Sequence, residues 1–138
     1  MPAPEYLDSN VIIRAVANDH AEHSSRAQQF LTALAEPVER DVTLTEAVLV
    51  ETVLVLSSPR LYKLPRVQIA QLLTDVVSLP GLTLSNREVY LDALAIYGSH
   101  NVDFVDALNA AHSSRNAGVV VSFDRDYDKI AVVQRIEP

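Results

Sequence analysis

Short runs of β-branched and aromatic residues alternate along the chain with longer stretches in which apolar residues recur every three or four positions. The short runs predict strands over residues 5–7, 41–44, 82–84, 119–122 and 132–136. The longer stretches predict helices over residues 9–16, 21–36, 45–56, 65–77, 87–97 and 103–116, and a short helical turn over 126–130. Because strands alternate with helices, we expect an α/β fold with a mostly parallel sheet.

Capping and turn residues mark several helix ends. Thr43-Leu44-Thr45-Glu46 matches a capping box, which gives Glu46 a structural explanation. Gly118 follows the last long helix, at the place where a left-handed residue commonly ends a helix. In the helix over 65–77, one apolar side is predicted to be buried, formed by Val67, Ile69, Leu72, Leu73 and Val76.

Composition narrows the class of protein. The 138 residues are 49% apolar and 21% charged, without a linker or repeat, so we expect one domain over 1–138. The absence of cysteine excludes a disulfide scaffold, a thiol nucleophile and a zinc–thiolate site. A net charge of -7 argues against a module that binds nucleic acid by charge alone. It argues less against a metal nuclease, because bound cations neutralise clustered carboxylates.

The N-terminal residues and the apolar runs bear on location. Residues 1–5 have neither the basic region nor the apolar region of a signal peptide. The longest nearly uncharged run, over residues 48–58, contains Glu51 and is too short to span a bilayer. We therefore expect a soluble cytoplasmic protein with no membrane partner.

Two aspartates follow strands and are candidates for a functional site. Asp8 comes directly after the first strand, and Asp124 comes after the strand over 119–122. In parallel sheets, functional groups gather beyond the carboxyl ends of the strands. The alternative is that each aspartate only caps the helix that follows it. Because two strands show the same feature, we interpret both residues as members of one carboxylate cluster.

Two helices supply further acids. Glu51 is the single acid in an apolar helical stretch, where a carboxylate needs a partner, a metal or a narrow solvent-exposed stripe. Asp103 and Asp106 lie three residues apart on one helix face, where the N-terminal dipole favours both. Asp103 is the expected cap, and capping explains Asp106 less well. Glu46 remains an alternative to Glu51.

Other site chemistries do not fit. Asp124, Asp126 and Asp128 have the spacing of a calcium loop, but Lys129 and Arg135 replace its glycine and glutamate. The four histidines form no ligand motif, and no phosphate-binding glycine loop or serine elbow occurs. What remains is a set of carboxylate oxygens, which suits Mg²⁺ or Mn²⁺. Two such ions promote phosphodiester cleavage in known enzymes.

Four segments, in order, resemble the PIN domain, and most closely the VapC-type toxins of bacterial toxin–antitoxin pairs. They are Leu7-Asp8-Ser9-Asn10-Val11-Ile12, Glu51-Thr52-Val53-Leu54-Val55-Leu56, Asp103-Phe104-Val105-Asp106-Ala107-Leu108 and Ser122-Phe123-Asp124-Arg125-Asp126-Tyr127. No single motif is specific, but the ordered set in a chain of this length is. The resemblance implies a single three-layer domain, with a central, mostly parallel sheet and helices on both faces.

The resemblance also implies an activity and a site. It implies an Mg²⁺- or Mn²⁺-dependent ribonuclease, usually a homodimer, that an antitoxin protein holds inactive. The catalytic, metal-binding carboxylates would be Asp8, Glu51, Asp106 and Asp124. Supporting positions would be Asn10 near Asp8, Ser122 orienting the last acid, and the acidic residues Asp103 and Asp126.

Two alternatives and two surface hypotheses remain open. A haloacid-dehalogenase-type phosphohydrolase would need a second aspartate where Asn10 stands. A catalytically inactive PIN-like interaction domain would show no metal-dependent activity. Arg60, Lys63 and Arg66 either guide RNA or form a plain solvated loop. The helices over 21–36 and 65–77 either form a groove for the antitoxin or pack into the core.

Overall fold

The computed structural model describes residues 2–138, and its order of elements confirms the α/β fold. The strands are β1 (Pro4–Tyr6), β2 (Asp41–Thr43), β3 (Leu82–Thr83), β4 (Val120–Val121) and β5 (Arg135–Ile136). The helices are α1 (Ser9–Ala17), α2 (Ala21–Ala33), α3 (Glu46–Ser57), α4 (Arg66–Val77), α5 (Arg87–Ser99) and α6 (Phe104–Arg115), with the 3₁₀ helix η1 (Arg125–Lys129). None of the helices described is long and apolar enough to cross a membrane.

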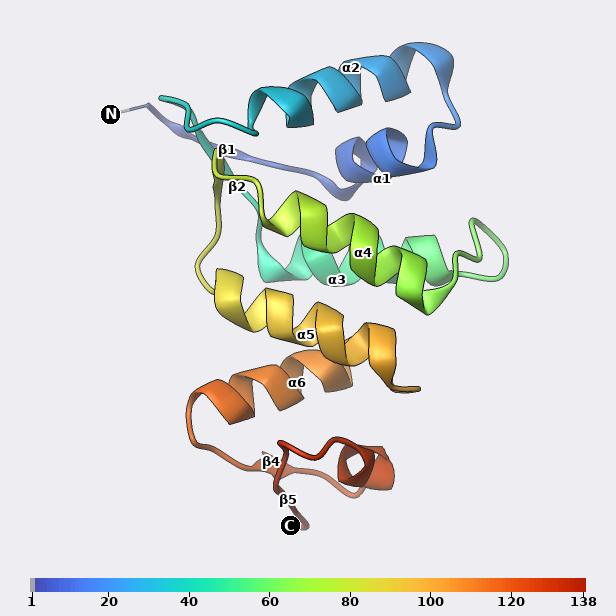
Figure 1. Ribbon diagram of the computed structural model, residues 1–138, viewed down its shortest axis with the longest axis vertical. Coiled ribbons are helices and arrows are strands. Elements are labelled where there is room, and N and C mark those ends of the chain that lie inside the picture. Colours follow the sequence, from blue (N-terminus) through green and yellow to red (C-terminus); the bar gives the residue numbers. More distant parts are fainter. Residues whose placement is uncertain (1) are drawn as a thin grey trace.

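All strand pairs are parallel, as expected, but the strands form two sheets instead of one. β1, β2 and β3 form a three-stranded sheet in that order, and β4 pairs with β5. Figure 1 shows the two sheets toward opposite ends of the molecule, with α5 and α6 between them. The strands are only two or three residues long, so each pairing rests on few backbone hydrogen bonds. The helices supply most of the packing.

The helix α3 lies at the centre of the helical packing. It contacts α1, α4 and α6, while α4 packs on α5 and α5 on α6. Leu49, Val53 and Leu56 of α3 are almost fully buried, because apolar residues cover most sides of this helix. On α4 the buried side is formed by Ile69, Leu73, Val76 and Val77. The prediction that Val67 is buried is wrong, since it lies in the first turn and is 66% exposed.

Two predictions about helix ends are also wrong. Thr45, not Thr43, caps α3, since its hydroxyl accepts a hydrogen bond from Val48 N at 3.4 Å. Glu46 is therefore the first residue of α3, and its side chain is free to contact His112 of α6. After α6, the left-handed residue is Ala117, with φ of 51°, and not Gly118. Gly118 instead donates its N–H to Ser113 O at 2.8 Å.

Candidate functional site

The first group of candidate residues joins the start of α1 to α3. Asp8 is the N-cap of α1, in extended backbone conformation, and its Oδ1 accepts a hydrogen bond from Ser9 N at 2.8 Å. Capping thus holds this exposed carboxylate at the end of the turn that follows β1. Ser9 is buried, and its hydroxyl donates to Glu51 Oε1 at 2.9 Å. Ser9 therefore links two of the predicted acids.

The structure places Glu46 and Glu51, the two alternatives for the second acid, in different surroundings. The two side chains lie on different sides of α3, since five residues correspond to about 1.4 helical turns. Glu46 Oε1 lies 2.7 Å from His112 Nε2 on α6. Glu51 is exposed and bonds to Ser9, beside Asp8. Of the two, only Glu51 stands in the same group as Asp8.

The second group is centred on Asp106. This carboxyl is partly buried in the first turn of α6, and its Oδ1 accepts a hydrogen bond from the Tyr127 hydroxyl at 2.9 Å. Burial raises the pKa of Asp106 above its ordinary value, and the Tyr127 hydrogen bond opposes that rise. The negative charges of Asp103, Asp124 and Asp126 raise it further. The carboxylates around Asp106 are therefore close enough to repel one another.

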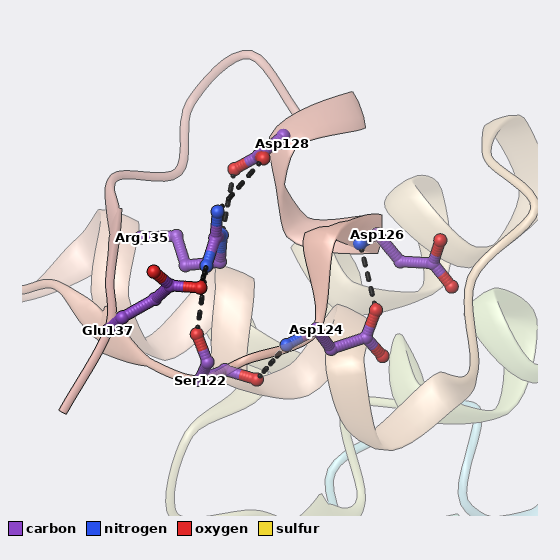
Figure 2. A network of polar contacts seen from close by, with 6 residues as sticks. All are labelled: Ser122, Asp124, Asp126, Asp128, Arg135 and Glu137. Carbon is purple, nitrogen blue, oxygen red and sulfur yellow. Dashed lines mark hydrogen bonds and ion pairs between the residues drawn. The ribbon is translucent and has the colours of Figure 1, made fainter.

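The loop after β4 positions two members of this group (Figure 2). Asp124 N donates to Ser122 Oγ, and Asp126 N donates to Asp124 Oδ1, both at 2.9 Å. Arg135 closes the other side of the loop, where Nη1 donates to Ser122 O at 3.0 Å and the guanidinium pairs with Asp128. In Figure 2 the carboxylates of Asp124 and Asp126 point away from Arg135. Their negative charges therefore lie on the side of the loop opposite the Arg135 guanidinium.

Among the predicted acids, the structure shows contacts within two sets. Asp8 and Glu51 form the first group, and Asp106 and Asp124, with Asp103 and Asp126, form the second. Over residues 2–138, no three acidic or histidine side chains are close enough to hold one metal ion. β1 and β4, the strands before Asp8 and Asp124, belong to different sheets. The expectation that Asp8 and Asp124 share one rim is not met in this arrangement.

The sequence profile of the PIN domain matches residues 6–133. The chain belongs to the PIN-domain family. PIN domains are generally metal-dependent nucleases, and PIN nucleases bind RNA. This assignment leaves the haloacid-dehalogenase alternative without support. A comparison with curated proteins finds no match.

The donor set of this PIN domain fits a hard divalent cation. Every candidate ligand is a carboxylate oxygen, the donor type that Mg²⁺ and Mn²⁺ prefer. The raised pKa of Asp106 arises partly from three neighbouring negative charges, and a bound cation would relieve that repulsion. The observation that supports a cation here is therefore electrostatic and comes from the group around Asp106.

Several contacts of the PIN domain were missed in the sequence. Tyr127 is 3% exposed, donates to Asp106, and accepts from Asn109 Nδ2 at 3.1 Å. Tyr127 lies in a short helical turn with no periodicity, and only its place directly after Asp126 and three residues after Asp124 hints at its role. In the sequence, Ser9 is typical of a residue that begins a helix. Its hydrogen bond to Glu51, 42 positions away, cannot be predicted from neighbouring residues.

Other residues have roles different from those expected. The guanidinium of Arg66 donates to Tyr97 O and Val102 O and lies 4.2 Å from the Tyr97 ring centroid, so it fixes α4 to the end of α5. The hypothesis that it guides RNA is therefore replaced by a structural role. Asn10 is exposed and lines a groove between α1 and α2. In the structure α2 packs mainly on α1 and α4 on α5. That these helices form a groove for an antitoxin stays a prediction.

Proposed function

We propose that this PIN domain is a divalent-metal-dependent ribonuclease whose essential carboxylates are Asp8, Glu51, Asp106 and Asp124. The observation that carries the proposal is the group around Asp106, where burial and three neighbouring carboxylates raise the pKa of one carboxyl in a member of a nuclease family. Perturbed carboxyls that share a site are typical of functional positions. The alternative, an inactive interaction domain, gives no reason for Asp106 to lie close to Asp103, Asp124 and Asp126.

Each side chain has a distinct task in this proposal. Asp106 and Asp124 would hold the cation, and Tyr127 favours the ionised form of Asp106 by donating a hydrogen bond to it. Ser122 fixes the backbone of Asp124, and Ser9 orients Glu51 beside Asp8. When bound, Mg²⁺ or Mn²⁺ lowers the pKa of a water molecule and neutralises charge on the phosphate. Asp8 and Glu51 complete the acidic surroundings in which water and phosphate are oriented.

The groove between α1 and α2 offers a path for the RNA strand. Its volume is about 820 Å³, and its lining includes Asn10, Arg14, Arg26 and Phe30. An aromatic ring and cationic side chains are the usual contacts for unpaired bases and phosphates. Asn10, which lines the groove, lies two residues after Asp8, a proposed catalytic acid, along the chain. This path replaces the hypothesis that Arg66 guides the RNA.

The resemblance to VapC-type toxins supports the biological role that we propose. In it, the protein is the toxin of a toxin–antitoxin pair in the cytoplasm, acts as a homodimer, and is held inactive by an antitoxin protein. Mg²⁺ is the preferred cation and Mn²⁺ a substitute. The order and spacing of the four motifs over almost the whole chain support this assignment.

The experiment is cleavage of total cellular RNA by purified, partner-free protein with Mg²⁺ or Mn²⁺. We expect discrete cleavage that EDTA abolishes and Mn²⁺ restores, and that Asp106→Asn abolishes. The matched control is Asp92→Asn. The sequence around Asp92 in α5 resembles the sequence around Asp106 in α6, but Asp92 pairs with Arg115 at 2.6 Å. Asp92→Asn should retain activity.

A second pair of variants separates the two glutamates. Glu51→Gln should abolish cleavage, whereas Glu46→Gln should only loosen the contact with His112. Activity that survives Asp106→Asn would refute the assignment of this residue. Protein that neither cleaves RNA nor binds Mn²⁺ would establish the inactive interaction domain instead.

A further inference from the structure

One side chain of the last strand contacts both ends of the loop that carries Asp124. Arg135 lies in β5, which pairs with β4. Its Nη1 donates to Ser122 O at 3.0 Å, where the loop begins. Its Nε and Nη2 donate to the two carboxylate oxygens of Asp128, at 3.0 and 3.2 Å, toward the end of η1. A single guanidinium thus joins the two ends of residues 122–128, as Figure 2 shows.

The geometry of this contact requires an arginine. The Arg135 side chain is only 12% exposed, and its pairing with Asp128 is bidentate. Its Nη1 also lies 3.4 Å from Glu137 Oε1, in the same strand region. A lysine has one ammonium group on a flexible stem and cannot reproduce the planar, forked set of donors. The position of the Arg135 guanidinium is therefore fixed by contacts on several sides.

Hydrogen bonds inside the loop fix its shape but not its place in the protein. Asp124 N donates to Ser122 Oγ, and Asp124 Oδ1 accepts from Asp126 N, both at 2.9 Å. Each of these bonds joins residues only two positions apart, so the loop could keep them while it moved as a unit. Contacts with other elements are needed to hold the Asp124 carboxylate in place.

Two side chains supply such contacts, from opposite directions along the chain. Tyr127 donates to Asp106 of α6 at 2.9 Å, and Arg135 reaches the loop from β5. The strands β4 and β5 have two residues each, so the backbone pairing that precedes the loop is short. The contacts of Arg135 add to this short pairing. The separation of Asp124 from Asp106, which a shared cation requires to be constant, depends on both attachments.

Arg135 holds the loop without neutralising the acids proposed to bind the cation. Its hydrogen bonds with Asp128 are the main cause that lowers the pKa of that carboxyl below its ordinary value. The carboxylates of Asp124 and Asp126 point away from the guanidinium in Figure 2. The positive charge of Arg135 is therefore compensated by Asp128, and the charge of Asp124 stays available to a metal ion.

We propose that Arg135 is a positioning residue, which joins Ser122 to Asp128 and so holds the Asp124 carboxylate where it binds the divalent cation. This role rests on the proposed function, because it assigns a task in that cation site. Arg135 lies outside residues 6–133, the part of the chain that matches the PIN-domain profile. The last strand thus contributes to the site from beyond the matched region.

The test is the affinity of the purified protein for Mn²⁺, measured by electron paramagnetic resonance without RNA. Arg135→Lys keeps the positive charge but loses the forked contact, and Arg135→Gln loses both. Positioning predicts that both variants raise the dissociation constant of Mn²⁺, by about tenfold. A purely electrostatic role predicts tighter binding by Arg135→Gln, because loss of a positive charge favours a cation nearby. Unchanged or tighter binding would overturn the proposal.

The matched control is Arg115→Lys. Arg115 forms a similar fork, with Nε and Nη2 donating to Asp92 at 2.6 and 3.2 Å, but this contact joins α6 to α5. The Arg115→Lys variant should bind Mn²⁺ as the wild type does, and urea unfolding compares the stability of the two lysine variants. An equal loss of Mn²⁺ affinity in both would mean that affinity follows general stability, which contradicts a specific role for Arg135.

Two further measurements distinguish positioning from direct catalysis. Saturating Mn²⁺ should restore most of the RNA cleavage by Arg135→Lys, since this variant retains every proposed cation ligand. Cleavage that stayed lost would instead assign Arg135 to the reaction itself. Asp128→Ala should weaken Mn²⁺ binding in the wild type and add little in the Arg135→Lys background, because both changes break one contact. Additive losses would contradict the proposal.

The outcomes separate the role of Arg135 from the proposed function. Wild-type protein that binds no Mn²⁺ would refute the cation site, and the role of Arg135 with it. Wild-type protein that binds Mn²⁺ no better than Arg135→Lys would leave the cation site intact and overturn only the role of Arg135. If Arg135→Gln fails to fold, Arg135→Lys and Asp128→Ala still decide the question.

Discussion

The Tyr127 hydroxyl is the most informative group to remove, because it connects stability to the ionisation of Asp106. Tyr127→Phe keeps the buried ring and deletes only the donor that lies 2.9 Å from Asp106 Oδ1. A hydrogen bond to a charged group contributes about 1.5–3 kcal/mol, and partial exposure of Asp106 reduces this to about 1–2 kcal/mol here. Asn109 is exposed and can turn its amide to water, so it adds little. The midpoint of thermal unfolding should fall by roughly 3–6 °C.

The pH dependence of this loss has a definite sign. Burial holds the pKa of Asp106 above its ordinary value in the folded protein, so the folded state binds more protons and stability falls as pH rises through that interval. Tyr127→Phe removes a hydrogen bond that lowers this pKa, so the pKa rises further. As pH rises from mildly acidic to neutral, the free energy of unfolding should therefore fall more for the variant than for the wild type.

Urea unfolding at both pH values measures the effect, and a carboxyl NMR titration follows Asp106 directly. The double variant with Asp106→Asn tests whether the two residues act through each other, since most of the loss from Tyr127→Phe should disappear in the Asp106→Asn background. An equal loss at both pH values, or an unchanged loss in that background, would refute the argument. The ring would then contribute through packing alone.

Three further predictions address packing, loops and surface ionisation. Leu49→Ala should lower the free energy of unfolding by about 2–5 kcal/mol in urea titrations, because it empties a fully buried position. Gly81→Ala should destabilise by about 1–3 kcal/mol in the same assay, since a Cβ there would lie 2.9 Å from Leu34 O and from Glu36 O. A Tyr62→Phe variant should raise the pKa of Asp19 toward its ordinary value, because the Tyr62 hydroxyl is the main cause that lowers it. That carboxylate stabilises the fold above its unfolded pKa and loses the effect as pH falls, which NMR titration of Asp19 would follow.

Much of the fold follows from the sequence because its signals are local. Apolar periodicity and bounding prolines define helices such as α4, which begins directly after Pro65. The division of the strands into two sheets has no such signal. Strand pairing depends on contacts between distant segments, and strands of two or three residues contribute little periodicity of their own. The prediction that Val67 is buried was wrong for a related reason. The apolar pattern of a helix does not show where the neighbouring helix ends.

The sequence predicts the candidate site as a set of residues but gives no arrangement for them. Carboxylates at strand ends or in apolar helices stand out because an acid there needs an explanation. Their grouping depends on which strands are neighbours, and this separates Asp8 from Asp124. The bonds of Ser9 to Glu51 and of Tyr127 to Asp106 join residues 42 and 21 positions apart. Such contacts are properties of the tertiary fold.

The central place of α3 has a consequence for amide hydrogen exchange. Its amides are surrounded by α1, α4 and α6, so their exchange requires opening of most of the core. The amides of β4 and β5 belong to a two-stranded sheet with two residues in each strand and need only a local opening. We therefore expect Glu51 to lie in a slowly exchanging segment and Asp124 to follow a quickly exchanging one. A bound cation that joined the two would slow exchange chiefly in residues 120–136, and protection there would report occupancy without any substrate.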